Sequence, residues 1–476
     1  MSFQSLIFLA FLIVSVPACI ISRRYSRHAG RSVLGISCLI FYVAGGGWDA
    51  FLVLCAGILV SRIAVTHLAG TPDSPQRKRV FVLALCYHIA VLLVFKYAGF
   101  FTNGLFKMEW VPLGLSFFTF QQLWLLKEVY TRQFASEGLV DELPWYALFY
   151  PTVTSGPILR PGAFFPQLTG SRFLCPSWED IAAGVYGICC GTAKKVLLAD
   201  PFGTLVNNGW ARLSDLSAPA AWLVMLGYTL QLYFDFSGYC DIAAGIARLL
   251  GIRLPVNFNS PYRSFSIGEF WKRWHITLTT FLRECLYFPL GGSKKGEVRT
   301  YLNIMVIFLV SGFWHGAGWT FIVWGALHGL AQVVERLWGR GRDRLPAFVR
   351  WALTFAFVNI AWVFFRAPDF AQAAQLLRAA VAGGLAKPES WLVAGLFGKE
   401  VGALQILFPA IKPWTDILRV LVLYGAGMIT VLLPRNVIGQ METFRPKWWQ
   451  GMALVILTAW SVLSFTGITT FIYSNF

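Results

Sequence analysis

Charged residues are scarce in this chain. Only 13% of its 476 residues are Asp, Glu, Lys or Arg, about half the share found in a soluble domain. Hydrophobic residues make up 57% of the chain, and its mean hydropathy is +0.60. Because a soluble protein of this composition would leave large apolar surfaces in water, an ordinary soluble enzyme is excluded. The composition predicts a multi-pass membrane protein embedded in the lipid bilayer.

Signatures of nucleotide, redox and metal sites are also missing from the sequence. There is no phosphate-binding GxxxxGK[ST] loop, no GxGxxG after a strand and no CxxCH for haem attachment. The nine cysteines lie mostly in apolar runs and show no paired metal spacing. We therefore predict no metal site and no permanently bound cofactor. No linker, long charge run or repeat divides the chain, which predicts a single integral-membrane domain over 1–476.

Apolar runs follow one another along most of the chain and predict an all-α polytopic fold of roughly 10–13 helices. The first run, 3–22, has no basic segment before it, so we expect an uncleaved helix rather than a signal peptide. The runs 32–45, 143–159 and 402–409 are too short to cross a bilayer alone and contain Gly or Pro. We expect these three to form tilted, buried or re-entrant helices.

The basic residues are clustered in short loops. The net charge is +17, and much of it lies at 23–31, 76–79, 294–299 and 336–344, beside apolar runs. Cytoplasmic loops of membrane proteins carry such an excess, so the bias explains the charge better than nucleic-acid binding does. It predicts that the N-terminus lies outside and that these loops are cytoplasmic. Lys294, Lys295 and Arg299 could also attract the phosphates of an anionic donor.

Residues 252–300 form the longest polar interval, and we expect a helix inside it. Ser266 and Glu269 have the spacing of a capping box, and Glu269 can pair with Arg273 one turn later. An apolar face follows at i, i+3, i+4 and i+7, formed by Trp271, Trp274, His275 and Leu278. The pattern predicts one amphipathic helix at the cytoplasmic boundary, with His275 on its apolar side.

His315 is the strongest candidate for chemistry. It lies among small residues in an apolar run, and an imidazole inside a membrane is costly unless it is paired or serves a function. Its ordinary pKa of about 6.5 suits the removal of a proton from an alcohol. The alternative is a histidine that only bonds a neighbouring helix. Its neighbour His328 is 13 residues on, about 220° around an uninterrupted helix, so we expect His328 to pack or to act through other residues.

Two acidic residues lie in another apolar segment. Gln231 and Asp235 share a helix face, and Asp241 follows, so they could line a cavity or form a structural polar network. Together with His275 and His315, the two aspartates could instead form the relay of an ion- or proton-coupled transporter. We find no inverted repeat that would support a transporter. A non-catalytic scaffold, with tryptophans as interfacial anchors, is a third hypothesis.

Seven segments resemble the membrane-bound O-acyltransferase family, and most closely its bacterial branch of alginate O-acetylation membrane proteins. They span about 110–330, in the order found in that branch. They are Pro112–Gln121, Ser155–Arg160, Lys194–Asp200, Leu232–Tyr239, Asn257–Tyr262, Glu269–His275 and Gly312–Gly316. The closing residues 471–476 resemble the aromatic C-terminus of the branch. The C-terminal part is shorter than in the branch, and 151–154 is less apolar.

The resemblance implies a ring of helices around a central tunnel, in the bacterial cytoplasmic (inner) membrane. It implies that His315 is the catalytic histidine and that His275 is the second active-site residue. Residues expected along the tunnel are Trp271, Trp274, Trp314, Asp235, Tyr239 and His328.

The expected reaction is the transfer of an acyl group, in particular acetyl from acetyl-CoA, to a hydroxyl. In this branch the acyl group passes to an exported polysaccharide such as alginate, cellulose or peptidoglycan. The expected partner is a separate periplasmic acetyltransferase of the SGNH-hydrolase type or another acceptor protein. We see no serine or thiol arranged as a nucleophile in these segments, which favours direct transfer with His315 as base.

Overall fold

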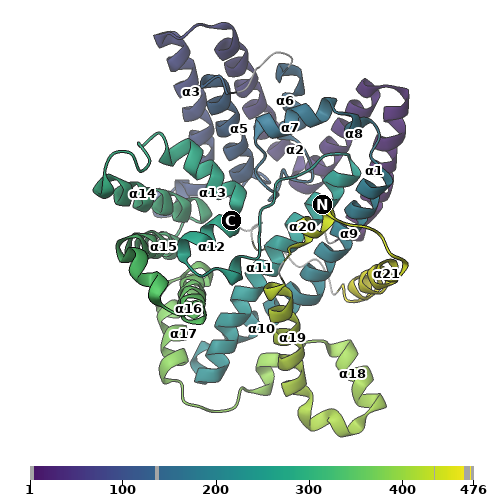
Figure 1. The fold of residues 1–476 in the computed structure, drawn as a ribbon, viewed down its shortest axis with the longest axis vertical. Helices are drawn as coiled ribbons and strands as arrows, with labels where there is room; N and C mark the ends of the chain where they lie inside the picture. The colour runs from purple at the N-terminus through teal and green to yellow at the C-terminus, as the bar shows by residue number, and fades with distance from the viewer. Residues whose placement is uncertain (1–4, 134–138, 434, 466–471, 473–476) are drawn as a thin grey trace.

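The computed structural model describes residues 5–133, 139–433, 435–465 and 472, and every regular element within them is a helix (Figure 1). This confirms the predicted all-α fold. The closing segment 471–476 lies outside the described residues except for Ile472. The first third of the chain forms α1 (Leu6–Tyr25), α2 (Arg27–Gly70), α3 (Pro75–Leu92), η1 (Leu93–Tyr97), α4 (Ala98–Phe101), α5 (Leu115–Tyr130), α6 (Leu139–Ala147), α7 (Pro161–Thr169) and α8 (Ser171–Leu174).

The rest of the chain forms the centre, the left side and the lower half of the molecule in Figure 1. Its middle part holds α9 (Trp178–Ala193), η2 (Lys194–Ala199), α10 (Asp200–Ala211), η3 (Leu213–Asp215), α11 (Ala218–Leu249), η4 (Pro261–Arg263), α12 (Ile267–Arg273), α13 (Ile276–Leu282) and η5 (Arg283–Tyr287). The last part holds α14 (Glu297–His315), α15 (Trp319–Trp338), η6 (Gly339–Arg344), α16 (Ala347–Arg366), α17 (Phe370–Ala382), η7 (Ser390–Val393), α18 (Gly398–Leu407), η8 (Pro409–Trp414), α19 (Thr415–Leu432), α20 (Val437–Glu442) and α21 (Trp448–Leu463).

Within the described residues, six helical segments are long and apolar enough to cross a membrane, which supports a multi-pass membrane protein. They are Ile7–Tyr25, Arg27–Gly70, Pro75–Phe101, Trp178–Ala211, Ala347–Arg366 and Pro409–Leu432. The short run 32–45 lies in α2, which starts earlier, at Arg27, and breaks at Gly47 with φ 79°. The run 143–159 gives α6 and turns, and 402–409 falls in the short α18 and the start of η8.

Helix α11 is the central element, and nearly all of it is buried. It packs against α9 through glycines. A Cβ atom on Gly191 would lie 2.6 Å from the carbonyl oxygen of Gly238, and one on Gly245 would lie 2.6 Å from that of Gly184. Only glycine permits so close a contact between two helix backbones. The α9–α11 pair is therefore a fixed core on which the other helices pack.

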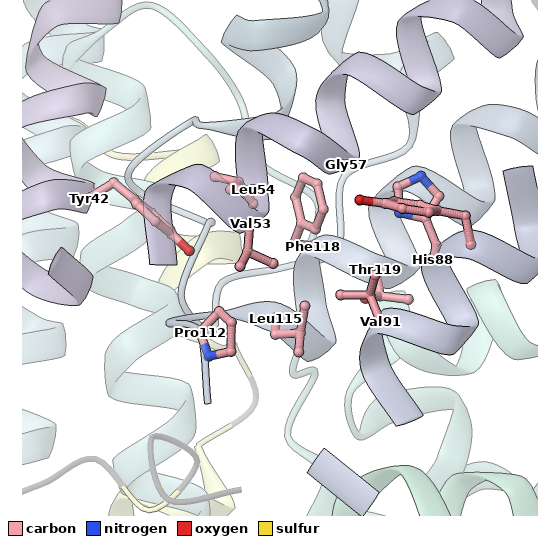
Figure 2. A pocket seen from close by; sticks show the side chains of 11 residues that line it. Tyr42, Val53, Leu54, Gly57, His88, Val91, Pro112, Leu115, Phe118 and Thr119 are labelled. Carbon is pink, nitrogen blue, oxygen red and sulfur yellow. The ribbon is translucent and has the colours of Figure 1, made fainter. Parts of the chain in front are cut away.

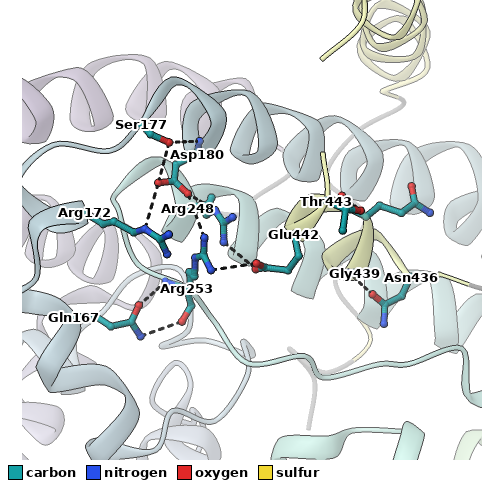
Figure 3. Close-up of polar contacts among 11 residues, drawn as sticks. Gln167, Arg172, Ser177, Asp180, Arg248, Arg253, Asn436, Gly439, Glu442 and Thr443 are labelled. Atoms are coloured by element: carbon teal, nitrogen blue, oxygen red, sulfur yellow. Dashed lines mark hydrogen bonds and ion pairs between the residues drawn. The ribbon is translucent and has the colours of Figure 1, made fainter. Parts of the chain in front are cut away.

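An ion-pair network closes one end of this helix pair (Figure 3). Arg248 of α11 bonds to Asp180 of α9 at 2.7 Å and to Glu442 of α20 at 2.9 Å. Arg253, in the segment after α11, pairs with Glu442 at 3.2 Å and donates its backbone N–H to Gln167 of α7 at 2.8 Å. The network joins four parts of the chain that are far apart in sequence.

Figure 2 shows a small pocket among α2, α3 and α5, with His88 on its wall. His88 of α3 is buried, and its Nε2 lies 2.9 Å from the hydroxyl of Ser61 in α2. Beside it is a cavity of about 10 Å³, lined by residues that include Tyr42, Leu115 and Phe118, which is room for about one water molecule. We take His88 as a buried histidine satisfied by its neighbour.

Candidate active site

His315 is the last residue of α14. Gly316 and Gly318 have extended backbones, so the chain leaves the helix there and α15 begins at Trp319. The two helices form a hairpin that packs closely through glycines. A Cβ atom on Gly312 would lie 2.4 Å from the Phe321 carbonyl oxygen, and one on Gly325 would lie 2.3 Å from that of Phe308. The small residues around His315 thus allow the two helices to come close together.

Aromatic rings surround the His315 side chain, which is only 3% exposed. The ring centroids of Trp314, Trp324 and Phe365 lie 4.7, 5.1 and 5.2 Å from that of its imidazole. The indole N–H groups of Trp314 and Trp324 are buried and have no hydrogen-bond partner among the described residues. Buried hydrogen-bond donors nearly always have an acceptor in folded proteins. These two N–H groups can therefore donate to an oxygen of a bound molecule.

Lys96 and Tyr97 hold the end of α14 from a distant part of the chain. The Lys96 ammonium donates to the carbonyl oxygen of Trp314 at 2.6 Å, and the Tyr97 hydroxyl donates to that of Phe313 at 2.8 Å. The last carbonyls of a helix lack partners within it and carry partial negative charge, so a cation stabilises them. Both side chains come from η1, a π-helical turn. Lys96 is not among the residues predicted from the sequence, although a lysine within the apolar run 80–98 is itself a signal of function.

His275 does not lie within a helix, so the continuous amphipathic helix predicted here is wrong. The cap is as expected, because Ser266 accepts from the backbone N–H of Glu269 at 2.9 Å and Glu269 pairs with Arg273 at 2.8 Å. However, α12 ends at Arg273, and His275 has a left-handed backbone with φ 44° and ψ 54°. The side chain is fully buried among aromatic rings, and it is not at an interfacial helix surface.

Asn257 is the reason for this break. Its backbone carbonyl accepts the N–H of Ile276 at 2.9 Å, and its side-chain oxygen accepts the hydroxyl of Thr277 at 2.9 Å. The same oxygen lies 3.2 Å from Nδ1 of His275. These contacts replace the hydrogen bonds of a continuous helix. They also fix the His275 ring, whose Nε2 is buried and has no hydrogen-bond partner in the described part of the chain.

Trp314 contacts both histidines. Its ring centroid lies 4.7 Å from that of His315 and 6.4 Å from that of His275. The structure therefore brings His275, Trp314 and His315 into one buried cluster. A buried imidazole that can accept a proton, beside indole donors, is suited to activate a hydroxyl and to stabilise a developing oxyanion.

His328 and Trp271 lie behind this cluster. The Trp271 indole donates to Nδ1 of His328 at 3.2 Å, and the His328 ring lies 5.0 Å from that of Trp324. The ring of Trp324 thus contacts both His328 and His315, and a role of His328 in the reaction stays a prediction. Trp274 is buried against Phe258 and Trp362, with ring centroids at 5.0 Å from each.

A sequence profile of the membrane-bound O-acyltransferase family matches residues 81–367, which include this whole cluster. The chain belongs to this family. It is therefore an O-acyltransferase, and the transporter and scaffold hypotheses lose their support.

Relatives of this O-acyltransferase cover most of its length. It is 36% identical to the peptidoglycan O-acetyltransferase of Helicobacter pylori over 78% of each chain. It is 35% identical to the probable alginate O-acetylase AlgI of Pseudomonas aeruginosa, over 77% of this chain and 73% of the relative. It is 28% identical to the teichoic acid D-alanyltransferase of Bacillus subtilis, over 54% of this chain and 69% of the relative.

The two aspartates in α11 of the O-acyltransferase have structural partners. Asp235 pairs with Lys195 at 2.6 Å and accepts the backbone N–H of Ile472 at 2.8 Å, while Asp241 pairs with Lys194 at 2.7 Å. These contacts agree with the structural polar network, which is one of the two interpretations given above for the segment with Asp235 and Asp241. Tyr239 bonds to the hydroxyl of Thr154. A tunnel-lining role for Asp235 and Tyr239 stays a prediction from the family resemblance.

Proposed function

We propose that this O-acyltransferase takes an acetyl group from cytoplasmic acetyl-CoA and passes it across a bacterial inner membrane for O-acetylation of an exported polysaccharide. The observation that carries the proposal is the buried cluster of His275, Trp314 and His315. Its relatives include a peptidoglycan O-acetyltransferase, a probable alginate O-acetylase and a teichoic acid D-alanyltransferase, which supports acyl transfer to a polymer of the cell envelope. A separate periplasmic SGNH-hydrolase-like protein or another acceptor protein would complete the delivery.

In the proposed reaction, His315 removes the proton of the acceptor hydroxyl while the hydroxyl oxygen attacks the thioester carbonyl. A carbon–oxygen bond forms, and the carbonyl oxygen gains negative charge. The indole N–H groups of Trp314 and Trp324 lie beside His315 and can donate to that oxygen. When the intermediate collapses, the carbon–sulfur bond breaks and the imidazolium returns its proton to the thiolate of CoA.

In this scheme His275 orients the reacting groups. Its Nδ1 faces the side-chain oxygen of Asn257, which fixes the ring so that Nε2 can bond to the acceptor or to the acyl donor. Lys96 has a related task, since it stabilises the helix end that carries His315. His315 thus moves a proton, whereas His275 and Lys96 position the groups that react.

Replacing His315 tests the function directly. His315→Ala should lower acetyl transfer by about 10²–10⁴-fold, because a general base typically contributes that much. The measurement is the acetyl content of the exported polysaccharide, together with the release of CoA from labelled acetyl-CoA by purified protein. His88→Ala is the matched control. It also removes a buried imidazole, but that imidazole bonds to Ser61 and is not part of the cluster around His315.

Measuring the amount of each variant in the membrane distinguishes a loss of catalysis from a loss of folded protein. A His315→Ala protein as abundant and monodisperse as the wild type, yet with wild-type acetylation, would refute the assignment of His315 as the base. Loss of acetylation in His315→Ala, with normal acetylation in an equally abundant His88→Ala protein, is the expected result.

A further inference from the structure

A groove of about 320 Å³ lies between α15 and α16, outside the cluster around His315. Its walls are mainly apolar, and Arg342 and Arg350 line it beside Glu335. We propose that this groove binds one anionic phospholipid, with an acyl chain along the two helices and the phosphate at the two arginines. The proposal does not depend on the reaction of His315.

The apolar wall has the length of one lipid leaflet. Helix α15 contributes Leu327, Leu330, Val334 and Trp338, which share one helix face. At 1.5 Å per residue this stripe is about 16 Å long, close to half of the roughly 30 Å hydrocarbon core. Leu330 and Val334 remain 54% and 51% exposed. Because α16 is one of the helices suited to cross the membrane, the molecule available to cover them is lipid.

The arginines lie where a lipid headgroup is expected. The stretch from Glu335 to Arg350 contains five arginines and only two carboxylates. Arg342 is held by Glu335, and Arg350 lies 3.3 Å from Asp343. The Nε groups of both arginines are nevertheless buried, with no hydrogen-bond partner among the residues that the structure describes. A phosphate oxygen is the acceptor that guanidinium groups bind best at a membrane surface.

The charge excess selects an anionic lipid over a zwitterionic one. Five arginines against two carboxylates give this stretch an excess of three positive charges, which attracts an anionic headgroup. The half-exposed Trp338 lies at the same end of the groove, and tryptophans favour the headgroup level of a bilayer. The inner wall includes Phe357, whose ring lies 5.3 Å from that of His328. A bound acyl chain would thus pack behind the aromatic residues that support the active site.

Native mass spectrometry of the purified full-length chain tests this site. The protein is released from mixed micelles that contain equal amounts of phosphatidylglycerol and phosphatidylethanolamine. The wild type should retain one phosphatidylglycerol in preference to phosphatidylethanolamine. Arg342→Gln/Arg350→Gln should lower that retention by about twentyfold, since each arginine near an anionic surface contributes roughly fivefold in binding.

Two further variants make the result decisive. Val334→Trp fills the groove and keeps both arginines, so it should also lose the lipid. Arg344→Gln removes an exposed charge from the same loop but does not line the groove, and it should retain the lipid. Equal retention of the two lipids by the wild type would overturn the proposal, as would full retention by the double variant or by Val334→Trp. Loss of retention in Arg344→Gln to the same extent would show general surface attraction and would also overturn it.

Discussion

At the scale of single residues, His275 combines an unusual backbone with a fixed ring. Asparagine tolerates the left-handed conformation better than most residues and keeps one donor and one acceptor. His275→Asn should therefore retain more acetyl transfer than His275→Ala, in initial rates measured with purified protein at matched concentration. Equal and complete loss in the two variants would indicate that His275 itself transfers a proton.

Lys96 offers a second residue-scale prediction. Lys96→Met removes the cation from the end of α14, and a small shift of His315 should lower kcat by roughly 10- to 100-fold. The KM for acetyl-CoA should change little, because Lys96 contacts the helix end. Lys96→Arg keeps the charge and should restore part of kcat. A Lys96→Met protein with wild-type kcat would exclude a positioning role.

At the scale of elements, the α14–α15 hairpin depends on its glycines. Gly312→Ala places a methyl group against the Phe321 carbonyl, and such overpacking costs about 1–3 kcal/mol. We expect a lower Tm in detergent and a parallel loss of activity. Gly425→Ala in α19 is the matched control, because a Cβ atom there has no neighbour within 4 Å. An unchanged Tm for Gly312→Ala would contradict the close packing of the hairpin.

The same elements show what the sequence could and could not predict. The Ser266 cap is a local pattern, and its prediction is confirmed. The break at His275 was not predictable, because the apolar spacing from Trp271 to Leu278 runs straight through it and the cause is Asn257, 18 residues upstream. A lysine in an apolar run could have marked Lys96 as a candidate, but its acceptor could not be predicted, because Trp314 is 218 residues away.

At the scale of the whole molecule, the helix pairs place distant loops on two sides. In the α14–α15 hairpin Gly312 meets Phe321 and Gly325 meets Phe308, so the basic loops 294–299 and 336–344 lie on one side. This agrees with their predicted cytoplasmic location. At the start of α11, Ala218 bonds to Gly384, and the other end of that helix lies at the Asp180–Arg248 network. At that same end Arg23, in the basic cluster 23–31 that is predicted to be cytoplasmic, donates to the Leu250 carbonyl oxygen. The loop with Lys387, at the opposite end of α11, should therefore lie outside.

Cysteine labelling tests this topology. Because Cys86 and Cys175 are exposed, the variants are made in a chain without native cysteines. An impermeant thiol reagent added to intact cells should label Lys387→Cys and leave Lys295→Cys unlabelled until the membrane is permeabilised. Both positions are exposed in the structure. Labelling of Lys295→Cys in intact cells would refute the topology and, with it, a cytoplasmic acyl donor.

The glycine contact between α9 and α11 also limits how the chain can evolve. Gly184 and Gly191 of one helix face Gly245 and Gly238 of the other, and the same helix pair sets the lysines of η2 opposite Asp235 and Asp241. A side chain gained at any of the four glycines would separate the helices and both ion pairs at once. Among natural relatives, substitutions here should consequently be rare, and lineages that accept one should also have changed its charged neighbours.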